Sequence, residues 1–281
     1  MKLLHGSDLH MDHAHRNRLD AFIRRLKTAS DENTILLLTG DITVANQTKH
    51  FDELSKTVKT LAVLGNHDFW YGSWDGTREK VHEVLSANGS CLLDREPDPI
   101  QLDDVSVVGD SCWYDAMSGN VLGSRLVMND WFFVEDFSQD SYNPGIGYYT
   151  NFGSHSLNRN SIISRIRVES NKRNMILSNK IGIACEKSDK ILILTHFPPW
   201  EKACLYKGLN TDPDYIPFYC NSSLGWEIET IASKYPQKKF EVLCGHTHDK
   251  FDGKITNNIR CRVASAKYGS PKVQEIQIFD W

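Results

Sequence analysis

Short apolar runs recur along the first third of the chain, and most of them stop at a glycine. They lie at Lys2–Gly6, Ile35–Thr39, Leu61–Leu64 and Val105–Gly109. The middle two contain almost no polar residue, which is typical of strands buried on both faces of a sheet. The pattern therefore predicts four strands in this region, and at least two of them are central.

The segments between these runs have helical spacing. Apolar residues recur every three or four positions between residues 19 and 26, and helices are predicted over about His50–Lys59 and Trp74–Ala87. Strands that alternate with helices are typical of stacked βα units with a largely parallel sheet. The first third is thus predicted to be an α/β layer.

The rhythm breaks at about residues 111–190, which are rich in aromatic and polar residues. A turn is predicted at Asn143–Gly145 and a helix over about Leu157–Cys185. We interpret this region as an insertion that packs near the active site, within a single domain covering residues 1–281. We also expect the insertion to act as a partial lid over that site.

The strand and helix pattern resumes after the insertion. Strands are predicted at Ile191–Leu194 and Phe240–Cys244, with a helix around Trp226–Lys234 between them. Two more strand-like runs follow, at Arg260–Val263 and Val273–Phe279, and they are predicted to close a second sheet.

Composition indicates an ordinary globular chain. The 281 residues have a formal net charge of -4, which gives no sign of a globally basic nucleic-acid-binding surface. The seven cysteines are scattered and odd in number, so free thiols in a reducing compartment are expected. Neither a signal peptide nor a membrane span is recognisable, and a cytoplasmic location without membrane contact is predicted. The sequence specifies no oligomeric state.

Clusters of metal-binding side chains follow five of the predicted strands. They are Asp8-Leu9-His10, Gly40-Asp41, Gly65-Asn66-His67-Asp68, Thr195-His196 and Gly245-His246-Thr247-His248. The carboxyl ends of strands in α/β sheets gather ligands, so these side chains are expected to converge. Burying them together without cations would be costly. Two divalent metal ions would remove that cost. The clusters therefore predict a hydrolase that activates a water molecule between two metals, and phosphate esters are the usual substrates of such sites.

Together these motifs resemble the complete set of the calcineurin-like metallophosphoesterase superfamily. The resemblance covers residues 2 to about 110 and about 191 to the end, and it leaves the insertion without a counterpart. It implies an α/β fold of the αββα type, in which two mixed β-sheets are flanked by helices.

The resemblance also implies a ligand set. Asp8, His10 and His248 would bind one metal, and Asn66, His196 and His246 the other, with Asp41 bridging both. Oxygen and imidazole ligands without sulfur suit manganese best, with iron or zinc as alternatives. A hydroxide held between the two metals would attack phosphorus in line.

Two further residues are assigned catalytic roles by the same resemblance. His67 would face the substrate and protonate the leaving oxygen or stabilise the transition state. Asp68 would orient the His67 imidazole and favour its charged form.

The motifs also indicate a branch of the superfamily. The chain lacks the arginine that protein phosphatases of this superfamily carry after Gly40-Asp41, and its third motif ends in Asp68. This is similar to the phosphodiesterase-like branch, whose substrates include nucleotides and nucleic acids. Phosphodiester hydrolysis is therefore expected.

Three alternatives remain open at this point. The first is a DNA or RNA nuclease, with a basic cluster that would contact phosphates or be a solvated helix face: Arg165, Arg167, Lys172 and Arg173. The others are a phosphomonoesterase and a non-catalytic protein-binding scaffold. Trp200, close after His196, is expected to be either a pocket wall or a core residue.

Overall fold

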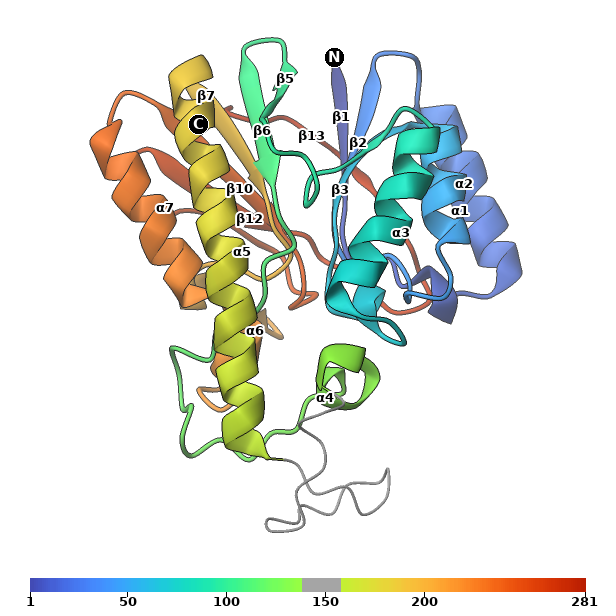
Figure 1. The fold of residues 1–281 in the computed structure, drawn as a ribbon. Coiled ribbons are helices and arrows are strands. Elements are labelled where there is room, and N and C mark those ends of the chain that lie inside the picture. The colour runs from blue at the N-terminus through green and yellow to red at the C-terminus, as the bar shows by residue number, and fades with distance from the viewer. Residues whose placement is uncertain (138–157) are drawn as a thin grey trace.

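Two β-sheets pack face to face, and each carries helices on its outer face (Figure 1). The structure is a computed structural model and describes residues 1–137 and 158–281. The turn predicted at Asn143–Gly145 and the first residue of the predicted helix from Leu157 lie outside the described residues. The predicted αββα arrangement is confirmed.

The first sheet has five strands in the order β13-β1-β2-β3-β4. Their bounds are Lys2–Gly6 for β1, Thr34–Thr39 for β2, Lys59–Val63 for β3, Cys91–Leu92 for β4 and Gln274–Ile276 for β13. β1 to β4 are parallel, and β13 is antiparallel to β1 at the edge.

The second sheet has six strands in the order β11-β12-β10-β7-β6-β5. Their bounds are Ile100–Leu102 for β5, Val105–Gly109 for β6, Lys190–Leu194 for β7, Lys239–Cys244 for β10, Phe251–Lys254 for β11 and Ile259–Val263 for β12. The four central strands are parallel, and β5 and β11 are antiparallel at the two edges.

Helices cover the outer faces. The first sheet carries α1 (Arg16–Ala29), α2 (Lys49–Thr57) and α3 (Trp74–Ala87), and the second carries α5 (Arg159–Lys187) and α7 (Ser222–Lys234). Shorter elements lie in the loops: α4 (Asp130–Phe133), α6 (Ile216–Tyr219), the hairpin β8 (Leu205–Tyr206) with β9 (Leu209–Asn210), and the 3-10 turns η1 (Met11–His13), η2 (His67–Phe69), η3 (Glu135–Phe137) and η4 (Glu201–Ala203). No helix of the described residues is long and apolar enough to cross a membrane.

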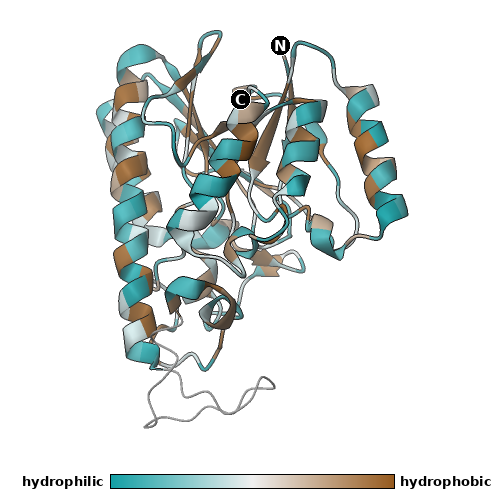
Figure 2. Ribbon diagram, turned by 45° about the vertical axis from the view of Figure 1, so that its right-hand side comes forward, coloured by the Kyte–Doolittle hydropathy of each residue, from teal (hydrophilic) through white to brown (hydrophobic). Residues whose placement is uncertain are grey.

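Side-chain alternation along the strands explains the layers. On β2, Ile35 and Leu37 pack between the two sheets, whereas Leu36 and Leu38 pack under the helices. Because successive side chains of a strand point to opposite faces, an uninterrupted apolar run fills both spaces. Figure 2 shows the same division, with hydrophobic strands inside and mixed helices outside.

The predicted bounds of β1, β6 and α3 agree with the structure, and two predictions need correction. The tail run does not close the second sheet as a whole, because β13 pairs with β1 in the first sheet while β12 and β11 extend the second. The helix predicted to reach Lys59 ends at Thr57, since Val58 is extended and β3 already begins at Lys59.

Buried charges fasten α5 to the edge of the site. The Arg173 guanidinium donates a 2.9 Å hydrogen bond to Asp110, directly after β6. The Lys180 ammonium donates to the backbone oxygens of Leu93 and Gly109 at 2.7 and 3.1 Å. Arg173 is therefore neither solvated nor free to bind phosphate, so the sequence-based interpretation of the basic cluster is wrong for this residue.

A buried histidine under the site makes the stability of the fold depend on pH. His5 lies on β1, and its Nε2 is 3.0 Å from the Thr39 hydroxyl. Burial lowers the pKa of His5 to about 4, partly opposed by Asp8. In the unfolded chain the His5 ring is protonated below about pH 6.5, whereas in the folded protein it stays neutral down to about pH 4. The free energy of unfolding is therefore unaffected by His5 above pH 6.5 and falls as the pH decreases from 6.5 towards 4.

We therefore expect His5→Gln to flatten the pH dependence of stability. Between pH 7 and 4.5 the wild-type free energy of unfolding should fall by roughly 2 kcal/mol more than that of the variant. Urea titrations at both pH values, with a chelator present throughout, measure the difference. Equal pH dependence in the two proteins would contradict the assignment.

Candidate metal centre

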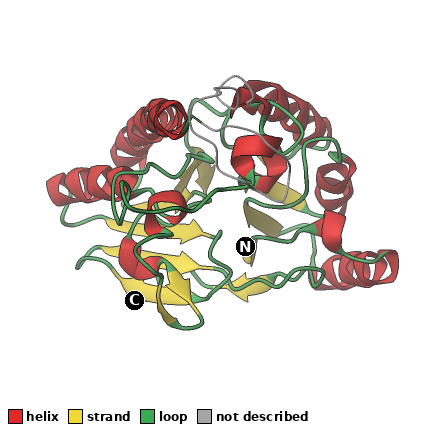
Figure 3. Ribbon diagram, turned by 90° about the horizontal axis from the view of Figure 1, so that it is seen from below, coloured by secondary structure: helices red, strands yellow, loops and turns green. Residues whose placement is uncertain are grey.

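The parallel strands of both sheets end on the same side of the molecule, seen from below in Figure 3. The loops that follow β1, β2, β3, β7 and β10 carry the five motif clusters. All seven predicted metal ligands come together there, from positions up to 240 residues apart in the chain.

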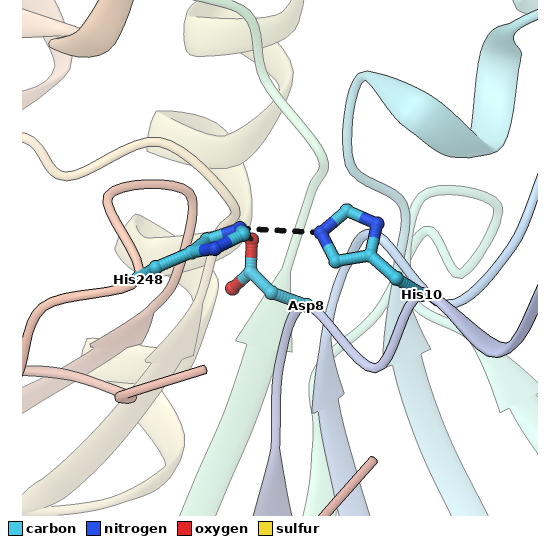
Figure 4. Close-up of side chains that lie close together, drawn as sticks. All are labelled: Asp8, His10 and His248. Atoms are coloured by element: carbon cyan, nitrogen blue, oxygen red, sulfur yellow. Dashed lines mark hydrogen bonds and ion pairs between the residues drawn. The ribbon is translucent and has the colours of Figure 1, made fainter. Parts of the chain in front are cut away.

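Asp8, His10 and His248 form one group of donor atoms that lie within 4.8 Å of one another. The Nε2 atoms of His10 and His248 are 3.1 Å apart, and the His248 Nε2 is 3.3 Å from Asp8 Oδ1. Figure 4 shows the two rings facing each other with the Asp8 carboxylate beside them. Two imidazole nitrogens at this distance repel each other unless a proton or a metal ion lies between them.

Asp41, His196 and His246 form the second group, and Asn66 lies within it. The His196 Nε2 is 3.4 Å from Asp41 Oδ1, and the Asn66 Oδ1 is 3.1 Å from both the His196 Nε2 and the His246 Nδ1. Asp41 also reaches the first group, because its Oδ2 is 4.0 Å from the His10 Nε2. The arrangement can hold two cations on either side of Asp41.

The backbone is strained at five of these seven residues. Asp8, His10, Asp41, His246 and His248 have φ angles between 41° and 71°. Non-glycine residues in this left-handed region cost of order 1–3 kcal/mol each and cluster at functional sites. The fold thus holds these ligands in conformations that the chain would not adopt locally.

Glycines allow the loops to approach one another. A Cβ atom on Gly65 would lie 2.2 Å from Asp41 Oδ1, and one on Gly245 would lie 1.8 Å from Ser7 Oγ. Neither position has space for a side chain. The glycine that precedes Asn66 and the one that precedes His246 are therefore required by close packing of the loops.

The charges of the second group compensate each other. Burial raises the pKa of Asp41, but the charge and the hydrogen bond of the neighbouring His196 hold it well below its usual value. Burial lowers the pKa of His196, and Asp41 overrides this and raises it to about 9. The His196 Nδ1 is 2.7 Å from the Thr39 backbone oxygen, so a proton on Nδ1 leaves Nε2 as the ligand atom. This donor set fits a divalent metal.

Asp68 does not make the predicted contact with His67. Its two carboxylate oxygens accept backbone N–H groups of Asp41, Ile42, Thr43 and Gly65 at 2.8–2.9 Å. Burial raises the pKa of Asp68 to about 8, together with the Asp41 charge, and the backbone amides of Gly65 and Thr43 oppose the shift. These hydrogen bonds show that Asp68 links the loop after β2, which carries Asp41, to the loop after β3, which carries Asn66.

His67 is held by other partners. Its ring stacks on Trp70 with 3.6 Å between centroids, and its backbone N–H donates to Asp41 Oδ1 at 2.8 Å. Burial lowers the pKa of His67 to about 4, although the Asp41 charge opposes this. The expectation that Asp68 favours the charged ring is therefore wrong, and the imidazole is neutral at pH 7.

Sequence reasoning missed residues around the metal ligands. A cavity of about 180 Å³ opens over the site, and its walls include Tyr219, Asp130 and Tyr268. The Tyr268 ring stacks on His10 at 4.2 Å, and the Tyr219 ring lies 4.6 Å from His246. None of the three belongs to a motif, and no local signal marks them.

Asp130 positions a metal ligand. Its buried carboxylate accepts hydrogen bonds from Asn66 Nδ2 at 2.9 Å, from Trp70 Nε1 at 2.7 Å and from the Tyr114 hydroxyl at 3.2 Å. The bond to Nδ2 turns the Asn66 Oδ1 towards His196 and His246. Partners of this kind fix the orientation of metal ligands.

We expect Asp130→Asn to weaken metal binding about 10- to 100-fold. The introduced amide oxygen can still accept the bonds from Asn66 and Trp70, but the variant loses the negative charge that strengthens them and the acceptor for the Tyr114 hydroxyl. Asp136→Asn is the matched control, because Asp136 accepts a 2.7 Å bond from the Trp74 backbone and touches no ligand. Metal titration of both variants by calorimetry measures the effect, and equal affinities would rule out the positioning role.

The other residues singled out in the sequence do not line the metal cavity. Trp200 is 9% exposed and packs in the core of the second sheet, with its Nε1 donating to Glu229 at 2.6 Å, so it is a core residue. Arg167 donates to the Ala116 backbone oxygen at 2.8 Å. All seven cysteines are free thiols, as expected.

The fold and the paired groups define a metal-dependent phosphoesterase. Residues 1–250 match the model of the calcineurin-like phosphoesterase family, and the chain belongs to this family. Members use divalent metal ions to hydrolyse phosphoric esters, which is the chemistry that the two donor groups can support. No curated protein sequence matches this chain.

Solved structures that share the fold include the following two. Phosphopantetheinyl hydrolase from Mycobacterium tuberculosis is 15% identical, with a TM-score of 0.67, over 95% of this chain and 90% of that one. A dimetal phosphatase from Danio rerio is 13% identical, with a TM-score of 0.51, over 94% of this chain and 87% of that one.

Proposed function

We propose that this protein hydrolyses phosphodiesters with two divalent metal ions. The observation that carries the proposal is the position of Asp41, whose two carboxylate oxygens lie between the two groups of donor atoms. Asp8, His10 and His248 would hold one ion, and Asn66, His196 and His246 the other, with Asp41 as the shared ligand. Manganese suits the donors best, and iron or zinc would fit as well.

The bound ions would supply an activated water and neutralise charge on the phosphoryl oxygens. His67 completes the site from the protein side. Its Nε2 is 3.9 Å from Asp41 Oδ2, so the ring lies next to the carboxylate that the two metals would share. A neutral ring can donate its Nε2 proton in a hydrogen bond to the leaving oxygen, and Trp70 holds the ring in that direction by stacking.

The walls of the site favour a diester over a monoester. Among the described residues, no lysine or arginine lines the cavity over the metal ligands. A phosphomonoester carries up to two negative charges near neutral pH, whereas a diester carries one. With the cations limited to the two metals, the singly charged diester is the better match. The names of the two similar structures, a phosphopantetheinyl hydrolase and a dimetal phosphatase, agree with phosphoester chemistry.

The other functions receive less support. A nuclease would use the basic cluster on α5, but Arg173 is buried against Asp110 and Arg167 is bonded to a backbone oxygen. A metal-free scaffold would not need seven convergent ligands. We also propose that residues 111–190 act as a partial lid, and the bond between Asp130 and Asn66 supports this role. A single domain over residues 1–281 and a cytoplasmic location are further proposals.

Hydrolysis of bis-p-nitrophenyl phosphate beside p-nitrophenyl phosphate, with manganese added, tests the proposal. We expect faster cleavage of the diester, together with two metal ions per chain by elemental analysis. A preference for the monoester would replace the diester assignment by a phosphatase. Inactivity on both substrates with two metals bound would contradict the proposed function.

A further inference from the structure

A second cavity adjoins the metal centre. It has a volume of about 520 Å³, and Tyr219 lies in its wall as well as in the wall of the metal cavity. Thr247, between the ligands His246 and His248, lines it from the side of the last motif. The volume falls within the range of small-molecule sites. A group attached to a phosphate at the metals would therefore find this cavity next to it.

Aromatic rings dominate the lining. Tyr206, Tyr215 and Tyr219 all contribute, and Leu205 is the one aliphatic residue of the lining that the structure describes. Tyr206 is 61% exposed and Tyr215 is 41% exposed. The Tyr215 and Tyr219 rings meet edge to face with 5.5 Å between their centroids, so they are not stacked on each other. The Lys207 ammonium lies over the Tyr206 ring, 5.1 Å from its centroid, so Tyr215 is the exposed ring beside the cavity that is suited to stacking on a planar ligand.

The other lining residues carry hydrogen-bonding groups. The hydroxyls of Thr211 and Thr247 are buried and have no partner among the described residues, and each residue is 9% exposed. A buried hydroxyl without a partner costs free energy, and rotation about χ1 would let a ligand supply one. The Asp212 carboxylate accepts one backbone N–H, from Asp214, and retains acceptor capacity for an amino group.

The cavity is held in place and is not basic. The Thr211 backbone N–H donates to the Cys204 oxygen at 3.0 Å, and the Gly208 N–H donates to Asp249, next to the ligand His248, at 3.2 Å. Among the described residues that line it, none is lysine or arginine. Asp212 is the charged residue of the lining, so a second phosphate is a poor match. Leu205 is its single aliphatic residue, so an alkyl chain is a poor match as well.

We propose that this cavity binds the nucleobase of a nucleoside phosphodiester whose phosphate lies at the metal centre. The base stacks on Tyr215, and its polar edge meets Thr211, Thr247 and Asp212. The assignment rests on the proposed function, because it names the substrate class of the same site.

Binding of adenosine, which has no phosphate, tests the cavity independently of catalysis. We expect calorimetry to detect adenosine binding to the wild-type protein and a loss of about tenfold in affinity for Tyr215→Ala. Tyr215→Phe keeps the ring and should restore binding, and Thr211→Val should weaken it by removing one hydroxyl. Trp226→Ala, at a 69% exposed residue outside the cavity, is the control and should bind like wild type.

Kinetics link the cavity to the reaction. Adenosine 5′-(p-nitrophenyl phosphate) should be cleaved with a kcat/KM about tenfold above that of methyl p-nitrophenyl phosphate, and Tyr215→Ala should reduce this ratio towards one. No adenosine binding with equal kcat/KM for both esters would overturn the nucleobase assignment and leave the proposed function intact. Adenosine binding without cleavage of either ester would contradict the proposed function but not the cavity. Binding of a neutral aliphatic amide in place of adenosine would also overturn the assignment.

Discussion

Replacing Asp41 by asparagine should remove one metal ion and nearly all activity. The substitution keeps the shape of the side chain and the acceptor for the His67 backbone N–H, but it removes the negative charge shared by both donor groups. Since metals contribute several kcal/mol to transition-state stabilisation, kcat/KM on bis-p-nitrophenyl phosphate should fall by roughly 10³-fold or more. Elemental analysis should find fewer than two metals per chain.

The control for this variant is Asp104→Asn. Asp104 pairs with Lys190 on the surface at 2.7 Å, far along the chain from every motif, and its loss should change neither metal content nor rate. Circular dichroism of both variants tests that they are folded. An Asp41→Asn protein with two metals and wild-type kcat/KM would exclude Asp41 as the shared ligand.

Replacing His67 by alanine should lower turnover without removing metal. Its ring stacks on Trp70, and its donor atom lies near those of His10 and Asp41, but the seven ligands proposed for the two metals do not include it. A positioned proton donor contributes about 10²–10⁴-fold, so kcat should fall within this range while metal content stays at the wild-type value. Steady-state kinetics and elemental analysis of the same preparation measure both quantities.

The leaving group separates donation by His67 from a structural effect. Phenolate needs stabilisation more than p-nitrophenolate does, so the variant should lose more activity on diphenyl phosphate than on bis-p-nitrophenyl phosphate. His67→Gln, which retains an N–H donor, should recover part of the loss. Equal losses on both esters, or loss of metal from His67→Ala, would mean that His67 supports the site in another way.

Much of the fold could be predicted because its signals are local. The run of apolar residues in β2 specifies a strand covered on both faces, and Gly40-Asp41 marks its carboxyl end. Parallel strands then bring their following loops to one side of the sheets, so the convergence of the ligands follows from order and spacing along the chain. Steric contact explains the glycines as well, since Gly65 has no space for a Cβ atom.

Other features depend on contacts between distant segments. The sequence motif places Asp68 beside His67, but tertiary packing directs its carboxylate to the backbone of the neighbouring loop. Likewise, the run containing β13 has the same pattern whichever sheet it joins, and only pairing with β1 decides. Spacing along the chain cannot predict the partner of Asp68 or the sheet that β13 joins. Both depend on which hydrogen-bond donor or sheet edge lies nearest in the folded protein.

By itself the sequence determined the two-layer α/β architecture, the seven candidate ligands and the reaction class, because strand patterning and ligand chemistry are properties of short segments. Only the tertiary structure decided that Asp130 orients Asn66, that His67 is neutral and stacked on Trp70, and that a tyrosine-lined cavity adjoins the metals. These features arise from burial and from side chains that meet across the fold, and burial sets both pKa values and cavity shape.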